Sequence, residues 1–170
     1  TAGNFQYSVM WSQYVSTPER TIYALGYPRK WGQTYLLDWH ATKHFNVSVF
    51  NAVISPNETL DHKKDVGISL ASPLIFVHAD KSPSGIQLNN ISGLILKYTI
   101  TPAVNIYAQG MLDETGSGDW QKRYGWQAGI RAGDLLNVQG WNVLAEFNTV
   151  RPYAYASDDE ATIYSHNNEP

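Results

Sequence analysis

Apolar and polar residues alternate with a period of two along most of the chain, most clearly between residues 91 and 151. Successive side chains of an extended chain point to opposite faces, so this period predicts β-strands. One face of the predicted strands is apolar, as at Leu94, Ile106 and Val143, and the other face is polar. The predicted strands cover residues 5–12, 20–26, 35–42, 45–53, 94–100, 104–112, 124–132 and 141–149.

Glycine and proline mark the breaks in this pattern. A turn is expected at residues 17–19 and a loop at residues 27–32, where Pro28 and Gly32 interrupt the alternation. Residues 65–77 are irregular because of Pro73, which a central strand does not accept. That region is expected to form two short strands or a segment folded inward.

The predicted strands in the second half of the chain are roughly ten residues long, whereas globular strands have about five or six. Long alternating strands are typical of a transmembrane β-barrel with lipid outside and a polar lumen. Short links also alternate with long polar links, as periplasmic turns alternate with extracellular loops. The short links are 17–19, 42–44 and 101–102, the long ones are 56–64, 79–89 and 113–122, and the link at 133–140 is an exception.

We therefore expect an all-β fold, namely an antiparallel transmembrane β-barrel or a fragment of a larger one. A soluble antiparallel sheet with one wet face stays open as the alternative. Residues 1–170 are expected to be a single β-barrel portion, truncated at both ends, because the chain starts without a signal peptide and its last residues form a polar loop.

Composition narrows the function classes. The net charge of −3 and the pI near 5.9 argue against a nucleic-acid partner. No run of about 18 apolar residues is present, which excludes a helical membrane span. The 6 Trp and 11 Tyr residues fit both interfacial girdles and sugar-stacking surfaces. With no Cys, the chain has neither disulfides nor thiolate metal sites.

Motifs for catalysis or metal binding are missing from the sequence. Oxygen ligands cluster between Asp113 and Asp119, but the twelve-residue calcium loop with its terminal Glu is absent. The histidines are scattered, and there is no nucleophile elbow or phosphate loop. We expect no enzymatic activity, no metal and no cofactor.

Charged residues on the polar side of the strands are candidates for a network in the lumen. Both signs are present, and an unpaired charge in a confined space is costly, so paired networks are expected. On a soluble sheet the same residues would form the wet face. These residues are Asp38, His40, Lys97, Arg131 and Glu146.

Aromatic and charged residues of the long links are candidates for binding polysaccharide. Aromatic rings stack on sugar faces, and Arg and Asp hydrogen-bond to hydroxyls or acidic sugars. Interface anchoring or loop packing is the alternative for these rings. The candidates are Trp120, Arg151, Tyr153, Tyr155, Asp158 and His166.

Seven short blocks stand in one order along the chain: residues 35–54, 72–76, 109–114, 118–120, 124–129, 145–155 and 164–168. Together they resemble bacterial capsule-assembly outer-membrane proteins of the Wzi type, particularly those from Bacteroidetes. One difference is Val77-His78, where the family pattern has an Arg-Pro pair. The likeness spans roughly residues 34–170.

The resemblance implies a large barrel in the bacterial outer membrane. Its expected role is non-enzymatic, in the assembly or surface attachment of capsular polysaccharide or exopolysaccharide. The expected partners are outer-membrane lipid, surface polysaccharide and other outer-membrane proteins. Two alternatives remain. One is an outer-membrane component of a gliding-motility or secretion apparatus, and the other is a soluble β-sandwich carbohydrate-binding module.

Overall fold

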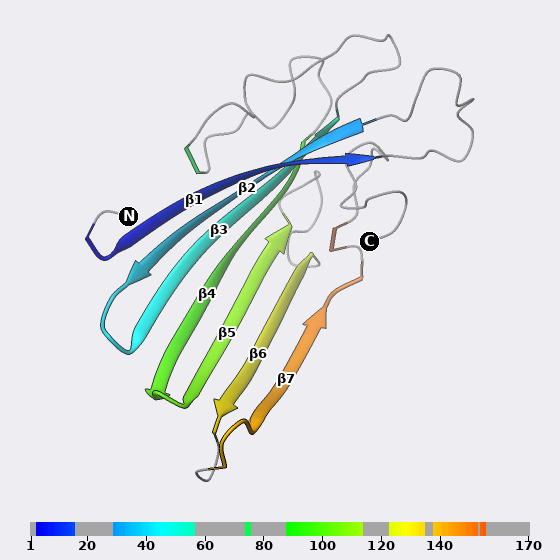
Figure 1. Cartoon of the computed structure of the whole chain (residues 1–170). Coiled ribbons are helices and arrows are strands. Elements are labelled where there is room, and N and C mark those ends of the chain that lie inside the picture. Colours follow the sequence, from blue (N-terminus) through cyan, green and yellow to red (C-terminus); the bar gives the residue numbers. More distant parts are fainter. Residues whose placement is uncertain are drawn as a thin grey trace, which may run out of the picture.

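The structure is a computed structural model, and it describes residues 3–15, 29–56, 74–75, 88–113, 123–134, 138–152 and 154–155. These residues form seven β-strands and no helix, so the predicted all-β class is confirmed. The strands are β1 (Phe5–Val15), β2 (Arg29–His40), β3 (Phe45–Pro56), β4 (Asn89–Thr101), β5 (Val104–Asp113), β6 (Tyr124–Gly133) and β7 (Asn142–Val150) (Figure 1).

All seven strands belong to one antiparallel sheet in sequence order, and each of the five inner strands pairs with the strand before it and the strand after it. The sheet is open, because β1 and β7 lie at its two edges and do not pair with each other. A closed barrel is therefore not what these residues form. The strands have 9 to 13 residues, close to the length that crosses a bilayer as a tilted strand.

One end of the sheet carries the short turns β2–β3 and β4–β5 and the connection β6–β7, and we call it the short-connection end. Hydroxyl and carboxylate side chains stabilise connections at this end by hydrogen bonds to backbone N–H groups. The Thr42 Oγ1 accepts the backbone N–H groups of His44 and Phe45, at 3.2 and 3.0 Å. Between β6 and β7, Asp134 and Gly140 have positive φ, and the Gly140 N–H donates to the Asp134 carboxylate at 2.7 Å. The predicted turns near 42–44 and 101–102 are confirmed at this end.

The prediction for the start of β2 is wrong in part. A loop was expected at residues 27–32, but the strand already begins at Arg29 and pairs directly with β1. Gly32 lies within this strand, and a Cβ added to it would overlap the ring of Tyr14 on the neighbouring strand. The strand expected at 20–26 lies outside the described residues, and only Leu74 and Ile75 of the irregular region at 65–77 are described.

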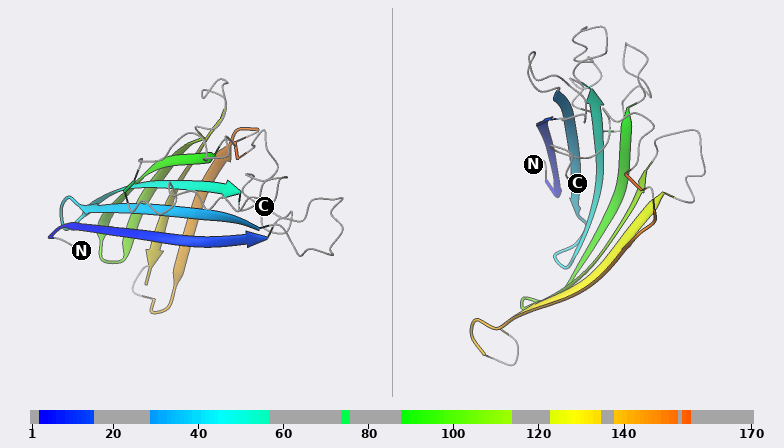
Figure 2. Two further views of the ribbon diagram at one scale, coloured as in Figure 1. Left: turned by 90° about the horizontal axis from the view of Figure 1, so that it is seen from above. Right: turned by 90° about the vertical axis from the view of Figure 1, so that its right-hand side faces the viewer.

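The register divides the side chains between two faces, because directly opposed residues of neighbouring strands share a face. Figure 2 shows the sheet twisted and curled, with the face seen in Figure 1 on the inner side of the curl. We name this the concave face and the other the convex face. One row of the convex face is apolar on every strand: Phe5, Trp39, Val47, Leu96, Ala108, Ala128 and Phe147.

Aromatic rings lie over glycines on the concave face. A Cβ added to Gly93 would overlap the ring of Phe50, and one added to Gly129 would overlap the ring of Tyr107. The aromatic residue is the direct cross-strand partner of the glycine in both pairs. Glycines of this kind let a sheet curl without crowding its inner side, and the aromatic ring covers the exposed backbone.

The other end of β2–β5, where the long connections run, is buried on both faces. On the convex side Val53 and Leu88 form a buried cluster. On the concave side Ile91, Met111 and Ala154 form a second one. The buried core of the described residues thus lies at this end of the sheet, whereas many apolar side chains nearer the short connections are exposed.

Candidate functional site

Large apolar side chains are exposed along the convex face, although such residues are usually buried. Phe147 is 60% exposed and Phe5 is 47% exposed. On the concave side of the strands, the large apolar residues with comparable exposure are Met10, Leu144 and Val150. We call these convex residues, together with the apolar residues beside them in the same rows, the apolar belt: Phe5, Tyr7, Trp39, Val47, Leu94, Leu96, Tyr98, Ile106, Ala108, Trp126, Ala128, Ile130, Val143 and Phe147.

Aromatic rings within the apolar belt pair across neighbouring strands. Phe5 stacks on Trp39 with ring centroids 6.0 Å apart, and Trp126 meets Phe147 at 5.2 Å. Such pairs add roughly 0.5–1.5 kcal/mol beyond the area that they bury. The pairs stabilise the strand register while leaving a large apolar surface to face its surroundings.

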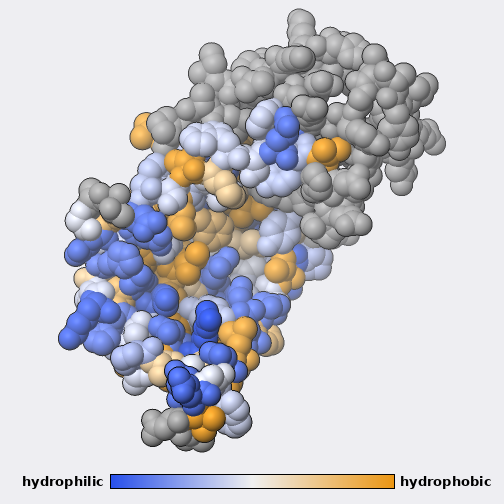
Figure 3. Space-filling model, viewed as in Figure 1, coloured by the Kyte–Doolittle hydropathy of each residue, from blue (hydrophilic) through white to orange (hydrophobic). Residues whose placement is uncertain are grey.

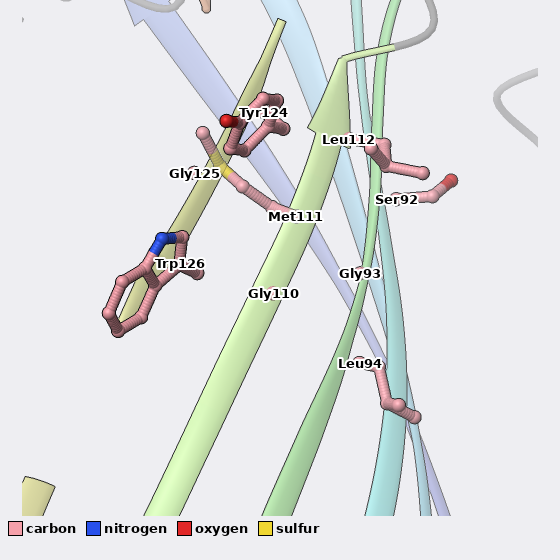
Figure 4. A pocket seen from close by; sticks show the side chains of 9 residues that line it. All are labelled: Ser92, Gly93, Leu94, Gly110, Met111, Leu112, Tyr124, Gly125 and Trp126. Atoms are coloured by element: carbon pink, nitrogen blue, oxygen red, sulfur yellow. The ribbon is translucent and has the colours of Figure 1, made fainter. Parts of the chain in front are cut away.

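A shallow apolar depression interrupts the apolar belt at Gly110. Leu94 and Trp126 flank the glycine on the neighbouring strands, and Leu112 and Tyr124 line the next row (Figure 4). A Cβ added to Gly110 would meet nothing within 4 Å, unlike the one added to Gly93. The depression can therefore accept an apolar chain of the surroundings without any change in the sheet.

The concave face carries polar side chains in the part nearer the short connections (Figure 3). All five residues predicted for the polar network lie on this face, within three adjacent cross-strand rows. The first row contains His40, Asn46, Lys97, Tyr107, Gly129 and Glu146. The second contains Gln6, Asp38, Ser48, Ile95, Gln109, Gln127 and Asn148, and Arg131 lies in the third, opposite Asn105.

Neutral groups satisfy the carboxylates of this face. The Tyr107 hydroxyl donates to Glu146, which Gln127 and Asn148 also contact. The Ser48 hydroxyl donates to the carboxylate of Asp38. In the described residues these carboxylates thus bind hydroxyls and amides, and the pairing of opposite charges in this network stays a prediction.

Sequence reasoning missed the neutral partners of Glu146, namely Tyr107, Gln127 and Asn148. The sequence did place these three residues at polar positions of the period-two pattern, and hence on the polar face of their strands. What the sequence lacks is the register, which places Gln127 opposite Asn148 and Glu146 opposite Gly129. A glycine in that position leaves room for the Tyr107 side chain to reach Glu146 from two strands away.

Two of the predicted polysaccharide-binding residues, Arg151 and Tyr155, are described. Arg151 follows β7, where its Nε donates to the Tyr124 hydroxyl at 3.2 Å and its guanidinium lies 5.4 Å from the centre of that ring. Arg151 is exposed at the long-connection end, as predicted. The other candidates, Trp120, Tyr153, Asp158 and His166, lie outside the described residues.

Tyr155 is tied to the end of β5 by both of its polar groups. Its N–H donates to the Asp113 carboxylate at 3.0 Å, and its hydroxyl donates to the Met111 sulfur at 3.0 Å. Burial, and secondly the Asp113 charge, raise the pKa of the Tyr155 phenol. With a positive φ of 84°, Tyr155 is held in a conformation unusual for a side chain of this size. These contacts are those of loop packing, which was the alternative to polysaccharide binding for this ring.

Among the residues that the structure describes, no group of three or more His, Asp or Glu residues is placed to hold a metal ion. Within the same residues, no helix is long and apolar enough to cross a membrane. Comparisons with protein-family models, curated proteins and solved structures find no match to this chain. Membership of the capsule-assembly family therefore stays a prediction.

Proposed function

We propose that the chain forms part of the wall of a β-barrel in the bacterial outer membrane. The observation that carries the proposal is the apolar belt, an apolar convex surface that runs across all seven strands. A contiguous apolar patch of this extent marks a membrane or protein interface. Lipid suits it because the opposite, concave face is polar, as in barrels with a polar lumen.

The soluble β-sandwich alternative needs a second layer over the convex face, because a sandwich buries both inner faces against each other. Two described residues outside the strands contact this face. Ile75 lies beside Tyr7, and Leu88 packs against Val53. Residues such as Trp39, Ile106 and Phe147 are left exposed. The exposed belt therefore favours the barrel over the sandwich.

Within this barrel the protein acts without catalysis in the assembly or surface attachment of capsular polysaccharide or exopolysaccharide. This part of the proposal rests on the resemblance to the Wzi-type family. It is supported by the exposed position of Arg151 beside the Tyr124 hydroxyl at the long-connection end, which would face outward. A gliding-motility or secretion role uses the same barrel, and no specific observation favours it.

Fractionation of cells that express the full-length gene product tests the location. The protein is expected in the outer-membrane fraction and to need detergent for extraction. If it is monodisperse in plain buffer with the convex face covered, the membrane part of the proposal is wrong.

Retention of polysaccharide on the cell tests the role. A Trp120→Ala and Tyr153→Ala double variant is expected to lower the amount of surface polysaccharide at equal abundance of the protein in the outer membrane. The matched control is Tyr98→Ala, an exposed aromatic residue at the short-connection end. Unchanged retention in the double variant, or an equal loss in the control, would leave the protein without this role.

A further inference from the structure

The concave face carries two cationic side chains that pair with no described carboxylate. Lys97 on β4 lies opposite Tyr107, and Arg131 on β6 lies opposite Asn105, so the two cations flank the same part of β5. The nearest acidic residue along the Lys97 row is Glu146, three strands away, at roughly 14 Å for a strand spacing near 4.8 Å. Glu146 lies nearer to Arg131, two residues along β7 from Leu144, the direct partner of Arg131. Its described hydrogen-bond partners are nevertheless Tyr107, Gln127 and Asn148.

The surroundings of the two cations offer neutral hydrogen-bonding groups. Asn105 accepts a hydrogen bond from the Thr99 hydroxyl at 2.8 Å through its Oδ1, which leaves its amide N–H groups to donate elsewhere. Gln109 lies two residues from Tyr107 along β5, and Gln127 of β6 is its direct cross-strand partner. Amides and hydroxyls of this kind match the hydroxyl groups of sugars, which both donate and accept.

From this arrangement we infer that the concave face binds an acidic saccharide between Lys97 and Arg131. Both cations are exposed on this face, and in the confined lumen of a barrel an anion supplies the partner that they lack among the described residues. The Arg131 guanidinium fits a carboxylate or a phosphate with two parallel hydrogen bonds, and the Lys97 ammonium adds a point charge. The site lies inside the curl, away from the long-connection residues predicted to bind polysaccharide.

The inference deepens the proposed function and rests on it, because the confinement comes from the barrel. The test uses the intact protein in lipid nanodiscs, titrated with oligogalacturonate and with a neutral malto-oligosaccharide of equal length. Oligogalacturonate is expected to bind more tightly, and more weakly as salt is raised, since salt screens the attraction between charges. Equal affinity for the neutral oligomer would overturn the inference.

Substitutions then locate the binding. Lys97→Gln and Arg131→Gln are each expected to weaken oligogalacturonate binding at least about tenfold, while Lys97→Arg retains most of it. Lys43→Gln is the matched control, because Lys43 is an exposed cation in the turn between β2 and β3. An equal loss in the control, or no loss in the two variants, would overturn the site. Circular dichroism of each variant checks that the sheet is intact.

Competition with glucuronate and with glucose 6-phosphate shows whether the site prefers a carboxylate or a phosphate. Displacement of oligogalacturonate by either one supports the site, and the stronger competitor names the preferred anion. Displacement by neither overturns the inference. Because location is measured separately by cell fractionation, failure of the binding test leaves the outer-membrane proposal standing.

Discussion

The two faces of the sheet are built from alternate residues of the same strands, yet they follow opposite rules. The convex face is apolar and exposed, with open space above Gly110. The concave face is polar and crowded, with rings over Gly93 and Gly129 and carboxylates bonded to neutral donors. The difference shows that the convex face leaves its apolar side chains and the space above Gly110 open, whereas side-chain contacts within the protein fix the concave face.

The largest expected effect comes from a charge placed in the apolar belt. Ile106→Arg on the convex face should destabilise the protein in lipid by about 2–4 kcal/mol, because a cation at mid-depth loses its hydration. Asn105→Arg, the next residue along β5, points to the concave face and should cost far less. Urea unfolding of both variants in lipid vesicles measures the difference. Equal losses would reverse the assignment of the faces.

A methyl group added to the crowded face should have the next largest effect. Gly93→Ala should cost about 1–3 kcal/mol, because its Cβ would overlap the Phe50 ring and the Gly110 carbonyl oxygen. The free energy of unfolding in lipid vesicles measures it. A double variant with Phe50→Leu, which removes the ring, should recover part of the loss. No loss in Gly93→Ala would contradict the close packing of the concave face.

A smaller effect is expected when a hydroxyl is removed. Tyr107→Phe should lower the urea midpoint, because Glu146 loses a donor. Tyr98→Phe, on the exposed convex face, should leave the midpoint unchanged. If both variants behave alike, the hydrogen bonds of the concave face do not contribute to stability.

The smallest effect is expected at Gly110. Gly110→Ala should change the free energy of unfolding by less than about 0.5 kcal/mol, since nothing lies within 4 Å of the added Cβ and the position is an ordinary strand position. The same unfolding measurement, run beside Gly93→Ala, checks it. A loss as large as that of Gly93→Ala would mean that the depression is filled by part of the protein.

Much of this architecture could be predicted from the sequence. A period of two fixes which side chains share a face of a strand, and this placed Ile106 with the apolar set and Lys97, Arg131 and Glu146 with the polar set. The turns near Thr42 and Thr101 were also predictable, because short polar residues there interrupt the alternation. The start of β2 was not, since Gly32 resembles a loop residue until Tyr14 covers it.

What only the tertiary structure decided is the arrangement across strands. The period along one strand carries no register, and a shift of two residues would preserve every face while changing every partner. The register keeps Glu146 three strands from Lys97 and brings Tyr107 to it instead. The packing of the residues after β7 likewise bonds Tyr155, a predicted polysaccharide-binding residue, to Asp113 and Met111. The sequence thus determined the two faces by local geometry, while pairing and side-chain contacts required the packed sheet.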